Sequence, residues 1–366
     1  MNNIKKLSNL GQSIWLDNIQ RRMLESGGLQ ELIDEGVLGV TSNPSIFEKA
    51  ITGSSDYDEQ LKALLSQGAS TDEIYEALVL TDIKMAADLL RPVYDQSEGI
   101  DGYVSLEVSP ELADLTQETI AEAKRYFDLL ARPNIMIKVP ATDAGIPAIE
   151  ELIAAGVNVN VTLIFALANY EKVANAYIKG LQRALAEGKE LHSIASVASF
   201  FVSRVDTAAD PALEDAGVEE LKGKIAVANA KIAYKRFKQI FSGEEWDRLA
   251  SAGARVQRPL WASTSTKNPE YSDTLYLDSL IGPHTVNTVP PSTLESYIDH
   301  GSVTLTLEDG VGRAEQQVKE LKEAGIDFDA ITDKLQIVGV EAFAKSYRNL
   351  IDSINEKCKQ MKVKPA

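Results

Sequence analysis

The feature that most constrains the fold is an alternation of short apolar or β-branched runs with longer segments of helical periodicity. Between the runs, apolar residues recur at i, i+3, i+4 and i+7, as in amphipathic helices. Strands that alternate with helices pair in parallel, and eight such units predict an α/β fold, a closed (β/α)8 TIM barrel with extra helices. The eight runs are 13–17, 36–43, 103–109, 134–140, 157–165, 193–206, 258–264 and 284–290.

The length of the chain fits one decorated barrel. At roughly 150 residues per domain, 366 residues would suggest two or three domains, but barrels of this class often exceed ~250 residues as one. We expect a single barrel domain over residues 1–366, with a helical insertion at about 45–95 and C-terminal helices at about 311–361. An open doubly wound sheet is the alternative, but it usually has fewer strands, and no G-x-G-x-x-G turn follows the first run.

Strand parity separates an aliphatic face from a polar face in four of the runs. Alternate residues of a strand point to opposite faces. In the run 134–140, Ile and Val residues share one face and Lys138 lies on the other. The same split sets Asp17 and Glu107 opposite aliphatic residues in their own runs. Because helices cover the outside of a barrel, we expect Asp17, Glu107 and Lys138 in the lumen, at its C-terminal mouth.

Three charged groups in one lumen predict an active site. An isolated Lys in a strand is more often an edge or snorkelling residue, but buried charges are costly unless paired, and here they converge. A Lys held inside a barrel can attack a carbonyl as the neutral amine and form a Schiff base, and nearby carboxylates can move the protons that this chemistry requires. The hydroxyl and amide groups suited to hold a water and sugar hydroxyls are those of Thr162, Asn43, Asn160 and Ser199.

Composition narrows the possible partners. The chain has 37 Lys and Arg against 54 Asp and Glu, a net charge of −17, which argues against nucleic acid and anionic membranes as partners. No stretch approaches ~18 uninterrupted apolar residues, so no membrane span is expected. The single Cys, Cys358, fits a reducing, cytoplasmic location. No metal site is predicted, because no metal-ligand spacing links His192, His284 and His300.

Six segments, in order along the chain, resemble the transaldolase family. They are LDN (16–18), GVTSNPSIF (39–47), SLEVSP (105–110), IMIKVPATDAG (135–145), NVTLIF (160–165) and SFFVSRVD (199–206). Residues 261–290 are similar to the longer bacterial branch of that family. The resemblance implies a cofactor-independent class I enzyme of the pentose phosphate pathway. Such enzymes transfer a dihydroxyacetone unit from sedoheptulose 7-phosphate to glyceraldehyde 3-phosphate, giving erythrose 4-phosphate and fructose 6-phosphate.

The resemblance also implies roles for individual residues. Lys138 matches the Schiff-base lysine, and Asp17 matches the acid/base group at the C4 hydroxyl. Glu107 and Thr162 match the pair that positions the catalytic water. The groups that bind the dihydroxyacetone moiety are matched by Asn43, Asn160 and Ser199.

The phosphate-binding part departs from the family pattern. Arg204, five residues after Ser199, matches a phosphate ligand, and Ser263 fits a Ser that follows the seventh strand. Shorter relatives have an Arg close to that Ser. Here the only nearby cation is Lys267, after extra residues, so we expect charge without the bidentate fork of an Arg.

Two other functions compete with transfer. Some shorter relatives are aldolases that release free dihydroxyacetone, and they tend to have Tyr where this chain has Phe201. Phe201 therefore favours transfer. A catalytically silent barrel that only binds phosphosugars has no need for a buried amine. We expect small sugar phosphates as partners and a monomer or a homodimer.

Overall fold

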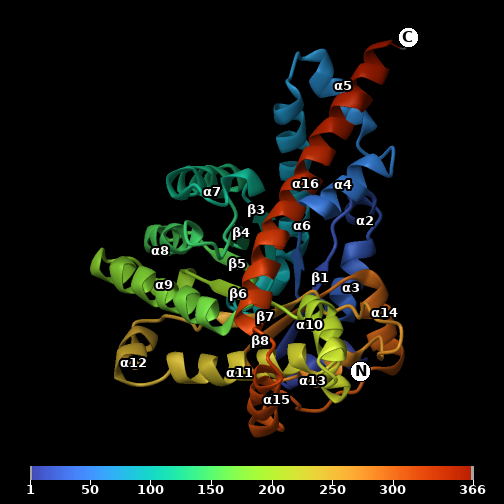
Figure 1. Cartoon of the computed structure of the whole chain (residues 1–366). Helices are drawn as coiled ribbons and strands as arrows, with labels where there is room; N and C mark the ends of the chain where they lie inside the picture. Colours follow the sequence, from blue (N-terminus) through green and yellow to red (C-terminus); the bar gives the residue numbers. More distant parts are fainter. Residues whose placement is uncertain (1, 364–366) are drawn as a thin grey trace.

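The computed structural model describes residues 2–363 and contains a closed barrel of eight parallel strands in sequential order (Figure 1). The predicted (β/α)8 fold is confirmed, and each predicted run contains one strand. The sixth run was drawn too long, because its strand ends at Phe201 and a helix begins at Ser203. The strands are Gln12–Asp17 (β1), Gly39–Thr41 (β2), Tyr103–Glu107 (β3), Ile135–Pro140 (β4), Val159–Ile164 (β5), Ser196–Phe201 (β6), Arg258–Ala262 (β7) and Thr285–Val289 (β8).

Helices surround the barrel, and those that follow β3, β4 and β5 are arranged side by side in Figure 1. Three short 3-10 helices lie at Pro110–Leu112 (η1), Leu191–Ser193 (η2) and Glu219–Leu221 (η3). The α-helices are Asn3–Asn9 (α1), Arg21–Glu25 (α2), Gly28–Glu35 (α3), Pro44–Thr52 (α4), Asp58–Ser66 (α5), Thr71–Gln96 (α6), Thr116–Leu130 (α7), Gly145–Ala155 (α8), Leu167–Ala186 (α9), Ser203–Asp215 (α10), Ile225–Ile240 (α11), Glu244–Ser251 (α12), Leu275–Ser279 (α13), Pro291–His300 (α14), Val311–Glu323 (α15) and Phe328–Val363 (α16).

The amino-terminal end of the lumen is filled and contains its own ion pair. Arg258, at the start of β7, lies 2.8 Å from the carboxylate of Asp101, which also accepts a hydrogen bond from the Trp15 indole. The indole packs so closely on β2 that a Cβ at Gly39 would lie 2.6 Å from it. Position 39 therefore needs a glycine, because any side chain there would collide with the indole.

The C-terminal helix α16 covers part of the barrel mouth. The Gln336 side chain donates hydrogen bonds to the carbonyls of Ala141 and Leu163. Ala141 directly follows the last residue of β4, and Leu163 lies within β5. Further along α16, the hydroxyl of Ser45 in α4 donates to that of Ser346. Figure 1 shows the far half of α16, in red, extending beside α4, α5 and α6.

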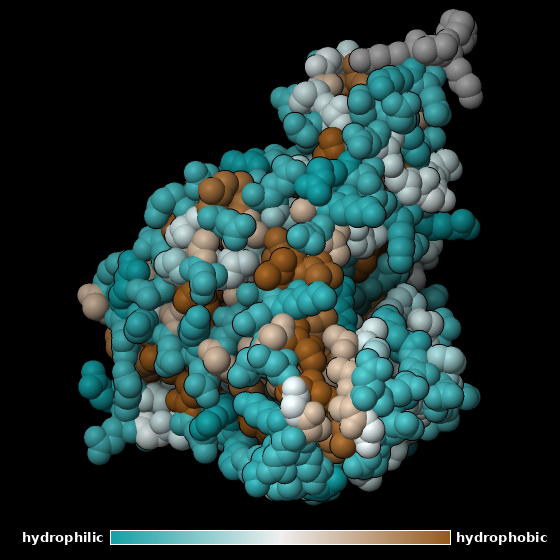
Figure 2. Space-filling model, viewed as in Figure 1, coloured by the Kyte–Doolittle hydropathy of each residue, from teal (hydrophilic) through white to brown (hydrophobic). Residues whose placement is uncertain are grey.

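The two decorations are thus helical and meet each other. Helices α4 to α6 occupy residues 44–96, and α15 and α16 occupy the C-terminal region. That the whole chain forms a single domain stays a prediction. In Figure 2 hydrophilic residues predominate on the visible face, with apolar residues gathered in a central band. Within residues 2–363, no helix is both long enough and apolar enough to cross a membrane.

Candidate active site

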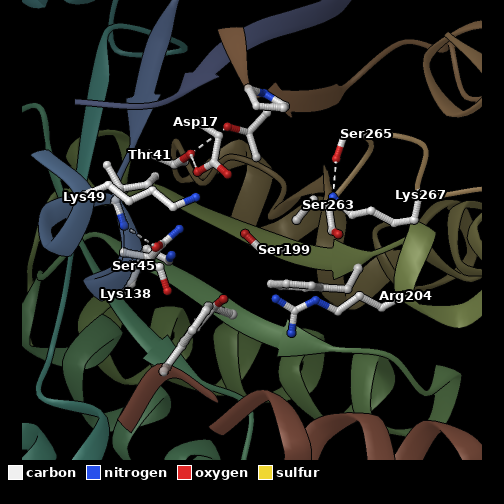
Figure 3. A pocket seen from close by; sticks show the side chains of 18 residues that line it. Asp17, Thr41, Ser45, Lys49, Lys138, Ser199, Arg204, Ser263, Ser265 and Lys267 are labelled. Carbon is white, nitrogen blue, oxygen red and sulfur yellow. Dashed lines mark hydrogen bonds between the residues drawn. The ribbon is translucent and has the colours of Figure 1, made fainter. Parts of the chain in front are cut away.

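A cavity of about 300 Å³ opens at the C-terminal mouth of the barrel (Figure 3). This volume is at the lower end of those that hold small ligands. Nine of the eleven residues proposed from the sequence line it: Asp17, Asn43, Lys138, Thr162, Ser199, Phe201, Arg204, Ser263 and Lys267. The other two, Glu107 and Asn160, are buried directly behind the lining and contact its members.

Lys138 is the central charged group of the cavity. It lies on β4, directly opposite Glu107 on β3, and its Nζ is 3.2 Å from Glu107 Oε2. The same Nζ donates a hydrogen bond of 2.9 Å to the carbonyl of Ser42, and it lies 5.8 Å from the ring centroid of Phe343 in α16. Only 5 % of Lys138 is exposed, so its amine is held at one position by a carbonyl, a carboxylate and a ring.

Glu107 and Thr162 lie on either side of the lysine strand. Burial raises the pKa of Glu107, and Lys138 opposes this effect. The Oγ1 of Thr162, on β5, is buried and has no hydrogen-bond partner within the described residues. After Thr162 the strand is irregular: the register with β6 shifts, and Leu163 has a φ of 60°. A non-glycine residue in this region is strained, and such strain is typical of functional sites.

Asp17 ends β1 and faces the cavity from the opposite side of the barrel to β4 and β5 (Figure 3). Its carboxylate accepts a hydrogen bond of 2.7 Å from the Thr41 hydroxyl, which lies 2.6 Å from that of Thr288. Burial raises the pKa of Asp17, while Lys138 and the Thr41 hydroxyl oppose the rise. The site thus contains two carboxyl groups whose pKa values are shifted upward, as proton-transfer groups require.

The polar groups near the lysine differ in how available they are. The Asn160 amide donates to the Ser105 hydroxyl at 3.0 Å and accepts from the Ser199 hydroxyl at 2.7 Å. The predicted contact of Asn160 with a ligand stays a prediction, and its observed contacts fix the orientation of Ser199. Asn43 caps α4 through its Oδ1, which accepts from the Ile46 N–H. Its amide nitrogen has no protein partner in the described part of the chain.

A second group of charges lies across the cavity from Lys138. Arg204, in the first turn of α10, has its guanidinium carbon 5.3 Å from the Phe201 ring centroid. Burial lowers the pKa of Arg204, and within residues 2–363 it has no carboxylate ion-pair partner. Lys267, in the loop after β7, donates a hydrogen bond to Ser265 at 2.7 Å. Ser263 has a φ of 55° and its hydroxyl lies 3.0 Å from that of Ser203.

Sequence reasoning missed several lining residues. Those with a polar or aromatic side chain are Thr41, Ser45, Lys49, Ser265, Thr288 and Phe343. Parity along the second and eighth runs contained a signal for Thr41 and Thr288, because Thr41 ends β2 and Thr288 is the next-to-last residue of β8. For Phe343 there was none, since nothing in a helical pattern indicates that α16 returns across the barrel.

The three histidines lie outside the cavity. His300 is hydrogen-bonded to Asp273, and His192 pairs with Glu190 at 3.7 Å. His284 lies at the opposite end of the barrel, just before β8. Within residues 2–363, no three His, Cys, Asp or Glu side chains gather as a metal site would require.

Comparisons with known proteins agree with this geometry. The family model described as transaldolase/fructose-6-phosphate aldolase matches residues 14–354. "Transaldolase 2" of Nostoc sp. is 47% identical, and the similarity covers 98% of each chain. "Transaldolase" of Saccharopolyspora erythraea is 48% identical over 98% of this chain and 99% of its own. With its eight-stranded barrel and its family signatures in place, the chain belongs to the transaldolase/fructose-6-phosphate aldolase family.

Proposed function

We propose that the protein is a transaldolase that transfers a dihydroxyacetone unit between sugar phosphates through a Schiff base on Lys138. The observation that carries the proposal is the buried Lys138 amine, 3.2 Å from Glu107, in the wall of a cavity that also contains Asp17. A barrel that only binds phosphosugars would gain nothing from burying an amine beside two carboxyl groups.

Schiff-base formation uses the groups around Lys138. The neutral amine attacks the C2 carbonyl of the donor ketose and gives a carbinolamine, from which a water leaves as the iminium forms. Glu107 and a water held by Thr162 move the proton to the departing hydroxyl. The unpaired Thr162 hydroxyl and the raised pKa of Glu107 support this role.

Cleavage of the carbon–carbon bond uses Asp17. Its carboxylate takes the proton of the C4 hydroxyl, the C3–C4 bond breaks, and the electron pair moves to the iminium nitrogen. An aldehyde leaves, and an enamine of dihydroxyacetone stays on Lys138. The acceptor aldehyde enters, the same steps run in reverse, and hydrolysis frees the product ketose.

The distal cations account for the phosphate. Arg204 and Lys267 line the side of the cavity away from Lys138, and Ser263 and Ser265 line the same side (Figure 3). Two cations and two hydroxyl donors suit a phosphate group. A ketose phosphate bound to Lys138 through C2 would extend its phosphate toward this end.

Transfer is tested by incubating the protein with fructose 6-phosphate and erythrose 4-phosphate. We expect sedoheptulose 7-phosphate and glyceraldehyde 3-phosphate, with little free dihydroxyacetone when the acceptor is omitted. Rapid release of dihydroxyacetone without an acceptor would assign the aldolase activity instead. No product under either condition would rule out both enzymes and leave a phosphosugar-binding barrel.

A further inference from the structure

A second cavity, of about 300 Å³, lies directly behind the phosphate end of the active site. It lies between α10 and the loop that connects β7 to β8, and Lys267 lines both cavities. Three carboxylates line the second cavity: Asp206, Asp210 and Glu214. The exposed Lys267 side chain can therefore extend either into the active-site cavity, where we propose that phosphate binds, or toward the three carboxylates of the second cavity.

Each of these carboxylates is already engaged. Asp206 accepts a hydrogen bond of 2.7 Å from the Ala226 N–H and one of 3.0 Å from the hydroxyl of Tyr276. Asp210 accepts one of 3.0 Å from the Gly223 N–H and one of 2.7 Å from the hydroxyl of Tyr271.

Glu214 is engaged as well, because it pairs with Lys222 at 3.2 Å. Both oxygens of Asp206 and of Asp210 and one oxygen of Glu214 therefore have partners, which weakens the attraction of these acids for the Lys267 ammonium.

The two tyrosines also hold the loop in place. Both belong to the β7–β8 connection, and both bind to α10, the helix whose first turn carries Arg204. Tyr271 further packs on Gly223 so closely that a Cβ there would lie 2.8 Å from its ring. The backbone from Asn268 to Tyr271 forms a turn, closed by the Tyr271 N–H on the Asn268 carbonyl at 3.2 Å. Lys267 is thus only four residues before Tyr271, whose hydroxyl is bonded to Asp210 on the helix that carries Arg204.

Lys267 needs such a restraint. Partial loss of solvent around its ammonium lowers the pKa of Lys267, and the like charges of Arg204 and Lys49 lower it further, while Asp17 opposes both effects. A lysine on a free loop would turn away from like charges and keep its rotamer entropy.

We propose that Tyr271 and Tyr276 are positioning residues of the phosphate site, which hold Lys267 beside Arg204 by fixing its loop to α10 and by occupying the carboxylates that would otherwise attract it. The inference rests on the proposed function, because it takes the distal cations as the phosphate ligands. It assigns to this chain a device for placing a Lys where shorter relatives have an Arg.

The test is Tyr271→Phe, which keeps the ring on Gly223 and frees one oxygen of Asp210. We expect the KM for fructose 6-phosphate, and the Kd for inorganic phosphate measured by calorimetry, to rise about tenfold. Trapping of unphosphorylated dihydroxyacetone on Lys138 with borohydride should stay within twofold. Tyr276→Phe should act in the same direction, so the proposal does not depend on one variant folding.

Two further variants separate positioning from general damage. Tyr271→Phe combined with Asp210→Asn should recover much of the phosphate affinity, because the charge that competes for Lys267 is removed. If Tyr271 only stabilises the loop, the double variant should instead bind phosphate more weakly than Tyr271→Phe alone. In a Lys267→Ala background, Tyr271→Phe should have no further effect on phosphate affinity. Tyr177→Phe is the matched control, since this buried tyrosine donates to the Arg255 carbonyl at 2.8 Å, outside both cavities.

Several results would overturn the inference. They are an unchanged phosphate affinity in both tyrosine variants, an equal loss in the Lys267→Ala background, or a parallel loss of dihydroxyacetone trapping. If the wild-type protein binds inorganic phosphate in a Tyr271-dependent way but transfers nothing, the transaldolase proposal fails and the positioning role stands. If it binds no phosphate, the positioning role fails whatever the turnover.

Discussion

A single hydroxyl group, that of Thr41, influences the charge state of Asp17 in addition to burial and the charge of Lys138. Thr41 contributes no charge, yet its hydroxyl donates to Asp17 and opposes the effect of burial on the Asp17 pKa. A hydrogen bond to a carboxylate favours the ionised form. The pH range in which Asp17 can accept a proton therefore depends on the Thr41 hydroxyl, which belongs to the neighbouring strand β2.

Replacement of Thr41 by Val tests this dependence. Loss of the hydroxyl removes a group that lowers the pKa of Asp17, so that pKa rises. The acidic limb of the kcat/KM profile should then move upward by about one pH unit. The profile is measured with fructose 6-phosphate and erythrose 4-phosphate from acidic to neutral pH. Thr41→Ser keeps the hydroxyl and is the control; a limb that moves equally in both variants, or not at all, contradicts the assignment.

At the scale of elements, α10 links stability to pH. Burial raises the pKa of Asp206 in this helix from 3.8 to about 7, and neighbouring Asp210 adds to the rise, while the Ala226 N–H and Tyr276 hydroxyl oppose it. Because the folded-state pKa lies above the unfolded one, the folded protein binds more protons between the two values. The free energy of unfolding should therefore fall as pH rises from about 4 to about 7.

Asp206→Asn should remove this part of the pH dependence. The amide is the same size and can still accept from Ala226, but it has no proton to lose. Urea unfolding at a series of pH values should show a flatter profile across this window, by an amount on the order of a few kcal/mol. Asp278→Asn, in α13, is the matched control, because it makes the same replacement at another Asp that accepts a hydrogen bond from a hydroxyl group. An identical slope in wild type and Asp206→Asn would mean that the buried carboxyl is not the cause.

We expect helix α16 to limit the access of water to Lys138, the proposed Schiff-base lysine. Phe343 closes the cavity beside the Lys138 amine. Its truncation in Phe343→Ala should enlarge the cavity at the point where we propose that the Schiff base forms, and the exclusion of water protects such intermediates. We expect more free dihydroxyacetone per transfer, together with a stability loss of about 3 kcal/mol. Product analysis with and without acceptor measures the ratio.

Phe343→Leu, which keeps most of the volume, should behave like the wild type. A ratio of release to transfer that is the same in all three proteins would show that α16 does not control hydrolysis.

What the sequence could predict at this scale depended on local periodicity. Parity in β1, β3, β4 and β5 separated lumen residues from helix-facing ones, so Asp17, Glu107 and Lys138 could be assigned before any fold was known. The return of α16 across the mouth could not, because it depends on contacts such as Ser45 with Ser346, 301 residues apart. Lys49 was missed for a related reason, since a helical Lys is usually solvated and only the placement of α4 turns it into the cavity.

At the scale of the whole molecule, a protein of net charge −17 must attract anionic substrates. The cavity does so locally, because Lys49, Arg204 and Lys267 lie around one opening and none of the three has a carboxylate ion-pair partner within residues 2–363. Most other lysines and arginines of the surface pair with acids, as Lys235 does with Glu315 at 2.6 Å. The acidic exterior and the basic mouth are therefore compatible, because the surface charge is largely compensated or solvated and the cations without acidic partners lie where we propose that phosphate binds.

The most informative measurement is the identity of the lysine that forms the Schiff base. The protein is incubated with fructose 6-phosphate, reduced with borohydride, digested and analysed by mass spectrometry. We predict a single adduct, a reduced three-carbon unit on the peptide that contains Lys138, and neither adduct nor turnover in Lys138→Ala. An adduct on another lysine, or near-wild-type activity in Lys138→Ala, would show that Lys138 in β4 does not form the Schiff base.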